Sequence, residues 1–505
     1  MDTISYKDYP KEPVVLDNLS MKFMKQSRFI PLALKDNTLV IAMEDPDDFH
    51  TLDALKLAYG LTLEVRKGSR DDILEAIENL YGAGKQSIET IIEEAHKDVH
   101  ELTPEADGDV DHLRDLASEA PIIRLVNRLI LNAVDMRASD IHFEPFEKEF
   151  KVRYRIDGVL HDVESPPARL QAAITSRVKI MAKLDIAERR LPQDGRIKLK
   201  VGEKEIDFRV STIPTLHGES LVMRILDRES LVLDFKKLGF PGDLLSNWKE
   251  LIRQPYGMVL VTGPTGSGKT STLYTTLAKI NSSETKIITL EDPVEYQLRG
   301  VNQIHVNRKI GLTFANGLRA IVRQDPDIIL VGEIRDKETA EIAIQSALTG
   351  HLLFSTLHTN DAAGAVTRLL DMGVENFLLS STLLGILAQR LVRVNCPHCK
   401  ETVVPDSKLI HSMRLSPDQI DGVTFVQGKG CEECRHTGYI GRTAIFEYLP
   451  VDDDIRREIN ASSSTEAIKK VATGKGLRTL RQDGWEKVKE GITTLSEVLR
   501  VTLEI

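Results

Sequence analysis

The stretch Gly263-Pro264-Thr265-Gly266-Ser267-Gly268-Lys269-Thr270 has the G-x-x-x-x-G-K-[ST] spacing of a phosphate-binding loop. The apolar run at 258–262 predicts a buried strand before it, and the apolar spacing of residues 271–280 predicts a helix after it. In that context backbone N–H groups turn towards phosphate oxygens at the positive end of the helix. We therefore predict that the segment from Gly263 through Ser271 binds a nucleotide. Lys269 would contact the β- and γ-phosphates and Thr270 would offer its hydroxyl to Mg²⁺.

The length and the composition of the chain indicate an ordinary globular protein of several domains. Its 505 residues are enough for about three or four domains, and 41% hydrophobic with 28% charged residues is typical of soluble proteins. A net charge of −10 argues against a chain-wide affinity for nucleic acid. No apolar run approaches the ~20 residues of a membrane span, and the polar, acidic start is not a secretory signal. We expect a cytoplasmic protein whose association with a membrane would come through a partner.

The first 82 residues read as a small α/β module. Apolar runs at 29–34 and 38–43 predict two strands, Asp45-Pro46-Asp47-Asp48 predicts a helix start, and the alternation at 61–65 predicts a third strand. We interpret residues 1–82 as a binding module, with a core-supporting extension as the alternative. Residues 83–111 are acidic and poor in core formers, which favours a solvated linker over an anionic interaction tail.

Residues 112–229 predict an α+β domain rich in arginine. An amphipathic helix at 120–134 is followed by alternating strands, including a hairpin over 196–210. Arginines on such strands are usually a solvated sheet face. The sharper hypothesis is that Arg196, Arg209 and Arg224 lie near the nucleotide and stabilise its charge.

Residues 230–394 alternate strands with helices, which predicts a parallel sheet covered on both faces. Acidic residues follow two of its strands, at Glu291-Asp292-Pro293-Val294-Glu295 and at Gly332-Glu333, where ligands bind in open α/β sheets. We predict that Glu295 orients the attacking water and that Glu333 serves Mg²⁺ and its water shell. His358, after a third strand, either senses the γ-phosphate or is structural. Arg319 and Arg323 are a subunit contact or plain surface.

All four cysteines lie in two C-x-x-C pairs, Cys396/Cys399 and Cys431/Cys434, separated by 31 residues. Two such pairs in a cytoplasmic protein predict a tetrahedral structural Zn²⁺ site within residues 395–437. A redox dithiol and free thiols are the alternatives. Residues 438–505 then read as a strand and a helical subdomain, whose last helix begins at the predicted capping box Thr494-Leu495-Ser496-Glu497.

Taken together, these residues resemble the secretion ATPases of type II secretion and type IV pilus systems. Four stretches carry the resemblance: the loop at 263–270, residues 291–295 like the family's aspartate box, 330–336 like its atypical Walker B, and 350–361 like its histidine box. Residues 192–196 and 217–219 match upstream. The resemblance covers residues 112–505 with high specificity and the first module more weakly.

The resemblance implies a RecA-like hexameric ATPase on the cytoplasmic face of the bacterial inner membrane, using ATP, Mg²⁺ and Zn²⁺. It implies a PAS-like α+β domain before the core, with Arg209 and Arg224 contacting the nucleotide. It also implies that residues 1–82 bind the cytoplasmic domain of an inner-membrane adaptor and that the motor drives an inner-membrane platform protein. The length and the single N-terminal module are more similar to the type II secretion member than to the pilus extension motor.

Three hypotheses from other classes stay open at this point. A nucleic-acid translocase would share the loop and the hexamer, but it should carry a basic, aromatic-bearing pore strip, which is not found. A nucleotide-dependent scaffold would bind ATP without turnover. A small-molecule kinase is weaker still, because no acceptor-binding constellation stands out.

Overall fold

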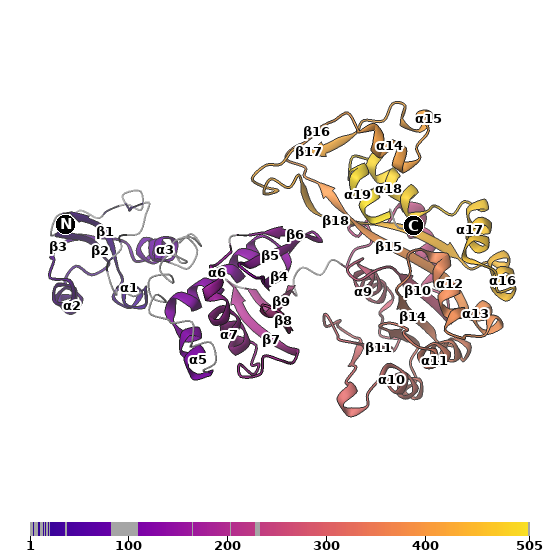
Figure 1. Ribbon diagram of the computed structural model, residues 1–505, viewed down its shortest axis with the longest axis horizontal. Helices are drawn as coiled ribbons and strands as arrows, with labels where there is room; N and C mark the ends of the chain where they lie inside the picture. Colours follow the sequence, from indigo (N-terminus) through magenta and orange to yellow (C-terminus); the bar gives the residue numbers. More distant parts are fainter. Residues whose placement is uncertain are drawn as a thin grey trace. The chain divides into compact units, whose positions relative to one another are not determined.

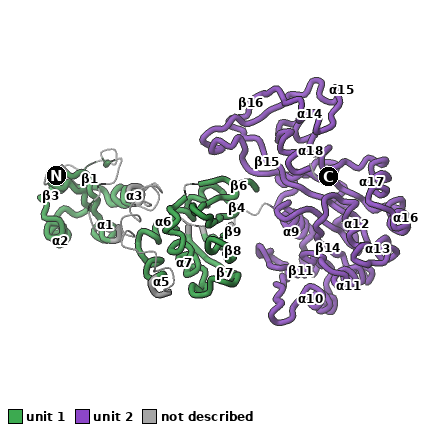
Figure 2. Tube along the Cα trace, viewed as in Figure 1, with its two compact units in different colours: residues 1–226 green, residues 227–505 purple. Residues whose placement is uncertain are grey.

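The computed structural model of this chain describes residues 21–35, 38–81, 110–163, 165–201, 204–227 and 233–502, with a few isolated residues before Met21 (Figure 1). The chain divides into two compact units, residues 1–226 and 227–505, which Figure 2 colours separately. The predicted acidic linker lies outside the described residues, apart from Val110 and Asp111 at the start of a helix. In the part of the chain that is described, no helix is long and apolar enough to span a bilayer.

The described part of the first module is a three-stranded sheet with three helices. Strand β2 pairs antiparallel with β1 and parallel with β3, so α2 makes the crossover between β2 and β3. Asp48 caps α2 by accepting from the Thr51 backbone N–H at 3.2 Å, which confirms the predicted helix start. The elements are α1 Met21–Ser27, β1 Phe29–Lys35, β2 Thr38–Met43, α2 Phe49–Tyr59, β3 Thr62–Lys67 and α3 Arg70–Tyr81.

The α+β domain is a six-stranded sheet with strand order β6-β5-β4-β9-β8-β7. Its apolar face packs on α6 and α7, while the strand residues that alternate with this core carry the arginines. Helix α5 was not predicted, because its sequence is mostly polar. The elements are α5 Val110–Ser118, α6 Ala120–Asp135, β4 Ala138–Pro145, β5 Phe150–Ile156, β6 Val159–Asp162, α7 Gln171–Met181, β7 Gln193–Val201, β8 Lys204–Thr215 and β9 Gly218–Asp227.

The core of the second unit is a seven-stranded sheet with the order β12-β11-β13-β14-β10-β15-β18, in which only β18 runs antiparallel to its neighbour. The elements are α8 Gly242–Leu251, β10 Gly257–Thr262, α9 Lys269–Ile280, β11 Ile287–Glu291, β12 Asn302–His305, α10 Phe314–Ile321, β13 Ile328–Val331, α11 Lys337–Leu348, β14 Leu352–Leu357, α12 Ala362–Asp371, α13 Asn376–Thr382, β15 Leu383–Asn395 and β18 Tyr439–Pro450.

Successive residues of β10 point to opposite faces of the sheet and pack into two different hydrophobic cores. Met258 and Leu260 pack with helices α10 to α13, whereas Val259 and Val261 pack with α8 and α9. The sheet is therefore covered on both faces, as its continuous apolar strands predict. Since β14 lies between β10 and β13, the loops that follow these three parallel strands meet at one edge of the sheet.

The cysteine-bearing lobe is an excursion between β15 and β18, and Figure 1 shows it extending beyond these two strands. It contains a short antiparallel pair, β16 with β17, and two helices. Four helices follow β18, and residues of all four join the core on the α10–α13 side of the sheet. The elements are β16 Lys400–Thr402, α14 Ser407–Met413, α15 Pro417–Ile420, β17 Val426–Gly428, α16 Asp453–Asn460, α17 Thr465–Gly474, α18 Leu480–Lys489 and α19 Leu495–Thr502.

Helix α19 packs on the core as predicted, through buried Val498, Leu499 and Thr502. The predicted capping box is half correct. The Glu497 backbone N–H donates to Thr494 Oγ1 at 3.3 Å, but the Glu497 carboxylate accepts from Arg393 of β15 at 2.7 Å and from Arg500. The carboxylate therefore ties α19 to the end of β15.

Glu497 should make this packing sensitive to acid. Burial opposes its ionisation, but hydrogen bonds from Arg500 and Arg393 outweigh that cost and lower the pKa of Glu497 to about 2. A lowered folded-state pKa stabilises the fold above the unfolded value of about 4.5, and this contribution, at most about 3 kcal/mol, is lost as the pH falls towards 2. Glu497→Gln should therefore lower the urea midpoint at pH 7, and its gap to wild type should shrink below about pH 4.5.

The midpoint can be followed by tryptophan fluorescence, because both tryptophans, Trp248 and Trp485, lie in this unit. The matched control is Glu490→Gln, because Glu490 is exposed and its replacement should leave the urea midpoint unchanged. A gap between Glu497→Gln and wild type that stays constant from pH 7 to pH 3 would show that the charge of Glu497 does not stabilise the fold.

Candidate nucleotide site and metal centre

The predicted phosphate loop joins β10 to α9, as expected. Gly263, Gly266 and Gly268 have φ values of 151°, 77° and 86°, and Gly268 begins α9 without a side-chain cap. The first N–H groups of the helix therefore stay open towards the loop. Pro264, Thr265 and Thr270 are exposed, whereas Ser267 is buried and Ser271 half-buried. The start of α9 therefore offers open N–H donors, with the exposed hydroxyl of Thr270 in the same first turn.

Lys269 is turned into the loop itself. Its Nζ donates to the carbonyl oxygens of Gly263 at 2.7 Å and Pro264 at 3.0 Å, and the side chain is largely buried. Burial lowers the pKa of Lys269 to about 8; nearby Glu333 opposes the shift and Arg390 adds to it. Phosphate oxygens would compete with these two carbonyls for a weakly solvated ammonium group.

Gln389 of β15 bonds to the phosphate loop and its neighbour Arg390 bonds to the segment after β14, and sequence reasoning missed both. Gln389 Nε2 donates to the Ser267 carbonyl at 2.8 Å, and its Oε1 accepts from Thr272 Oγ1 at 2.7 Å. Arg390 is buried and donates to Asn360 at 3.1 Å. The available signal was a polar pair inside an otherwise apolar strand, where buried polar groups need partners.

Glu333 and His358 meet Lys269 at the edge formed by the loops after β13, β14 and β10. His358 Nε2 lies 3.6 Å from a Glu333 carboxylate oxygen, and Arg335 pairs with the other oxygen. Burial first, and then the charge of Lys269, lower the pKa of His358, while Glu333 opposes them. The result is a half-buried carboxylate among a lysine, an arginine and a histidine, a mixture suited to binding a polyphosphate with its cation.

The two acids of the stretch after β11 have different surroundings. Glu291 is the last residue of β11 and is buried, with hydrogen bonds from Tyr274 Oη at 2.5 Å and Thr289 Oγ1 at 2.6 Å. Glu295 is half-buried in the following segment. Glu291 is thus committed to structural contacts, and the role of Glu295 towards water stays a prediction.

Arg196, Arg209 and Arg224 alternate with the core residues of their strands and so lie on the face of the sheet opposite α6 and α7. Arg196 and Arg209 are cross-strand partners in β7 and β8, and Arg224 Nε donates to Asp140 at 2.9 Å. Their predicted contact with nucleotide would join the two units and stays a prediction. In the second unit, Arg319 pairs with Glu338 of α11 at 2.6 Å, and Arg323 lies in a 3-10 turn beyond α10 rather than on the helix itself.

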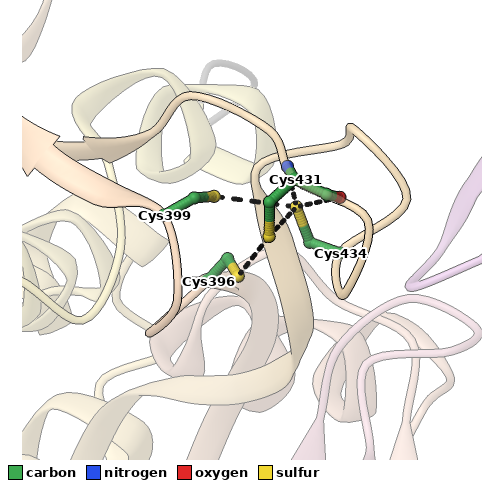
Figure 3. A group of neighbouring side chains, drawn as sticks. All are labelled: Cys396, Cys399, Cys431 and Cys434. Carbon is green, nitrogen blue, oxygen red and sulfur yellow. Dashed lines mark hydrogen bonds between the residues drawn. The ribbon is translucent and has the colours of Figure 1, made fainter.

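The four cysteines converge as predicted (Figure 3). Their sulfur atoms all lie within 4.8 Å of one another, and none forms a disulfide. The Sγ atoms of Cys396 and Cys431 are 3.8 Å apart, and those of Cys399 and Cys434 are 3.7 Å apart. Four sulfurs at about 2.3 Å from Zn²⁺ form a tetrahedron with edges of about 3.8 Å, so these residues fit the ion. Backbone N–H groups of Gly430, Cys431 and Gly438 donate to the sulfurs and favour thiolates.

Two protein-family models match this chain, one over its N-terminal module and one over the rest. A family model described as "Type II/IV secretion system protein" matches residues 115–500, and one described as "MshEN domain" matches residues 1–87. The type II secretion system protein E of Xanthomonas campestris pv. campestris is 54% identical, with 99% of this chain and 88% of that protein covered. The type II secretion system ATPase E of Vibrio cholerae is 51% identical, with 78% of each chain covered.

A pilus assembly ATPase and a solved ATPase structure are also similar to this chain. The type IV pilus assembly ATPase PilB of Myxococcus xanthus is 47% identical, with 98% of this chain and 88% of that protein covered. Among solved structures, the ATPase DotB of Legionella pneumophila superposes with a TM-score of 0.55 at 20% identity, covering 75% of this chain and 95% of that one. At 20% identity this superposition shows only that the two chains share a fold.

Proposed function

The chain belongs to the type II/IV secretion system protein family, and we propose that it acts as a hexameric motor at the cytoplasmic face of the bacterial inner membrane. It is an ATPase that powers type II protein secretion. The similarity to a type II secretion relative, at 54% identity, exceeds that to the pilus assembly ATPase, at 47%. Pilus extension is therefore the second candidate.

One observation carries the chemistry. Lys269, Glu333 and His358 come from loops after three adjacent parallel strands and face one another at a single sheet edge. Positive groups and open backbone N–H donors at that edge can take up the charge of a triphosphate, while a carboxylate serves its cation. A kinase would need an acceptor site in addition, and no such constellation stands out in the sequence.

In the proposed mechanism the loop from Gly263 to Ser271 binds the phosphates, and Lys269 exchanges its loop carbonyls for phosphate oxygens. Thr270 and Glu333 would hold Mg²⁺, which supplies charge neutralisation when bound. Glu295 orients the water that attacks the γ-phosphorus, and His358 contacts the γ-phosphate and senses its loss. Arg209 and Arg224 would add positive charge to the bound nucleotide.

The proposed partners follow from the family and from the division of the chain. Residues 1–82 would bind the cytoplasmic domain of an inner-membrane adaptor, and the ATPase unit would drive an inner-membrane platform protein during assembly of a pilin-like fibre. Association with the membrane would come through these partners. Zn²⁺ would be held by the four cysteines as a structural ion.

The test is to measure ATP turnover of the full chain with and without the cytoplasmic piece of the adaptor, reading the oligomer mass in parallel. We expect turnover and the hexamer fraction to rise together, because the adaptor would supply the neighbour-to-neighbour arrangement that completes the site. If neither changes and single-stranded DNA stimulates turnover instead, the protein is a nucleic-acid translocase and the adaptor proposal falls.

A further inference from the structure

Tyr274 is a fully buried residue one and a half turns into α9, the helix that starts at the phosphate loop. Its hydroxyl donates to Glu291 at 2.5 Å. Burial first, and then the charge of Glu291, raise the pKa of Tyr274, whereas the neighbouring backbone of Tyr296 and Glu295 opposes that shift. One side chain of the loop helix therefore bonds to the end of β11 and packs against Tyr296, the neighbour of the proposed water-orienting residue.

The other contacts of this segment make it a closed network. Glu291 also accepts from Thr289 and from Gln303 of β12, the latter at 3.2 Å. Gln303 Nε2 donates to the Tyr296 carbonyl at 3.0 Å, and its Oε1 accepts from the Leu298 N–H at 2.7 Å. The Tyr274 and Tyr296 rings meet edge to face at 6.4 Å. The backbone at Tyr296 and Leu298 is thus bonded to Gln303 of β12, and Gln303 and Tyr274 of α9 both donate to Glu291.

From these contacts we infer that Tyr274 is a positioning residue for hydrolysis: its hydroxyl sets the place of the Glu295 backbone relative to the phosphate loop. This inference rests on the proposed role of Glu295. Glu291 serves as the anchor of the network rather than as a ligand of the substrate, because it is buried and both its oxygens are taken. ATP binding depends on the loop amides and Lys269, which the network does not contact in any bond described here.

The rigid link has a physical reason. The water that attacks must be held in line with the bond that breaks, and an error of about 1 Å in such a group costs up to about 100-fold in rate. A segment after a strand has few backbone partners of its own, so side chains must fix it. Tyr274 lies on the helix whose N-terminus would bind the phosphates. The position of Glu295, which would orient the attacking water, is therefore linked to the same helix as the phosphate loop.

Tyr274→Phe is the test, since it keeps the ring and its packing against Tyr296 and removes only the hydroxyl. We expect kcat to fall about 10- to 100-fold, with KM and the dissociation constant for ATP within about twofold of wild type. The matched control is Thr276→Val on the same helix. It removes an equally buried hydroxyl, one that accepts from Trp248 Nε1 at 3.1 Å, away from the Glu295 segment.

The comparison with Glu295→Gln separates this inference from the proposed function. If Tyr274 acts through Glu295, adding Tyr274→Phe to Glu295→Gln should change the residual turnover by less than about twofold. A Tyr274→Phe enzyme with wild-type kcat, or one that only melts earlier as Thr276→Val does, overturns the inference while leaving Glu295 in place. Wild-type turnover in Glu295→Gln instead removes the proposed role of Glu295 itself.

Discussion

Lys269→Ala should abolish ATP hydrolysis and leave the fold intact. Removing the charge that meets the β- and γ-phosphates takes away transition-state stabilisation worth about 100- to 1,000-fold in rate, the scale on which single preorganised donors act. ATP affinity should fall as well, because the same ammonium binds the ground state. Phosphate release at saturating ATP, together with ATP binding by calorimetry, measures both effects.

The fold should tolerate this change for an electrostatic reason. Burial lowers the pKa of Lys269 to about 8, which means that the folded protein disfavours the charged form of this side chain. Removing it should therefore cost little stability, and circular dichroism and the melting temperature should stay near wild type. Lys279→Ala, at an exposed position of the same helix, is the matched control and should keep full turnover. Turnover retained in Lys269→Ala would contradict the site assignment.

The second large effect is expected at the four cysteines. The purified chain should hold one Zn²⁺, and Cys399→Ser should lose it, because three thiolates bind the ion far more weakly than four. Structural zinc contributes about 10–16 kcal/mol to folding in small zinc domains, so residues 396–438 should lose hydrogen-exchange protection on metal removal. Metal analysis and exchange mass spectrometry give the two readouts.

The neighbouring histidine supplies the control for the metal site. His398 lies between two of the cysteines in sequence, but four sulfurs already complete a tetrahedron. His398→Ala should therefore keep its zinc and its protection. Full zinc content in Cys399→Ser, or a metal-free wild type whose lobe stays protected, would show that the cysteines are not a structural zinc site.

Local patterns predicted most of the sheet and helix framework. The strands at 328–331 and 352–357 could be predicted because strands buried on both faces are rich in apolar residues. Ser355 and Thr356 of the second strand are buried as well, since their hydroxyls donate to backbone carbonyls. The Asp48 cap was predictable because a cap is a contact over three residues. Helix α5 was missed because polar residues make up most of it.

The candidate site was predictable only where its residues follow strands or form a motif. Lys269, Glu333 and His358 could be found because parallel strands bring their ends to one edge. Gln389 and Tyr274 could not, since each acts through a partner that sequence spacing does not reveal: Gln389 bonds to Ser267, 122 positions away. The structural role of Glu291 could not be predicted either, because it depends on burial. Glu291 is buried and Glu295 is half-buried, although both are acids of the same short stretch.

ATP hydrolysis by this chain powers type II secretion. The most direct measurement uses the organism that encodes it, with Lys269→Ala introduced in the chromosome, and compares the proteins released into the medium with the number of surface pili. We expect the released proteins to disappear while the number of pili stays at the wild-type value. Secretion that continues while pili are lost, or no change in either, would contradict it.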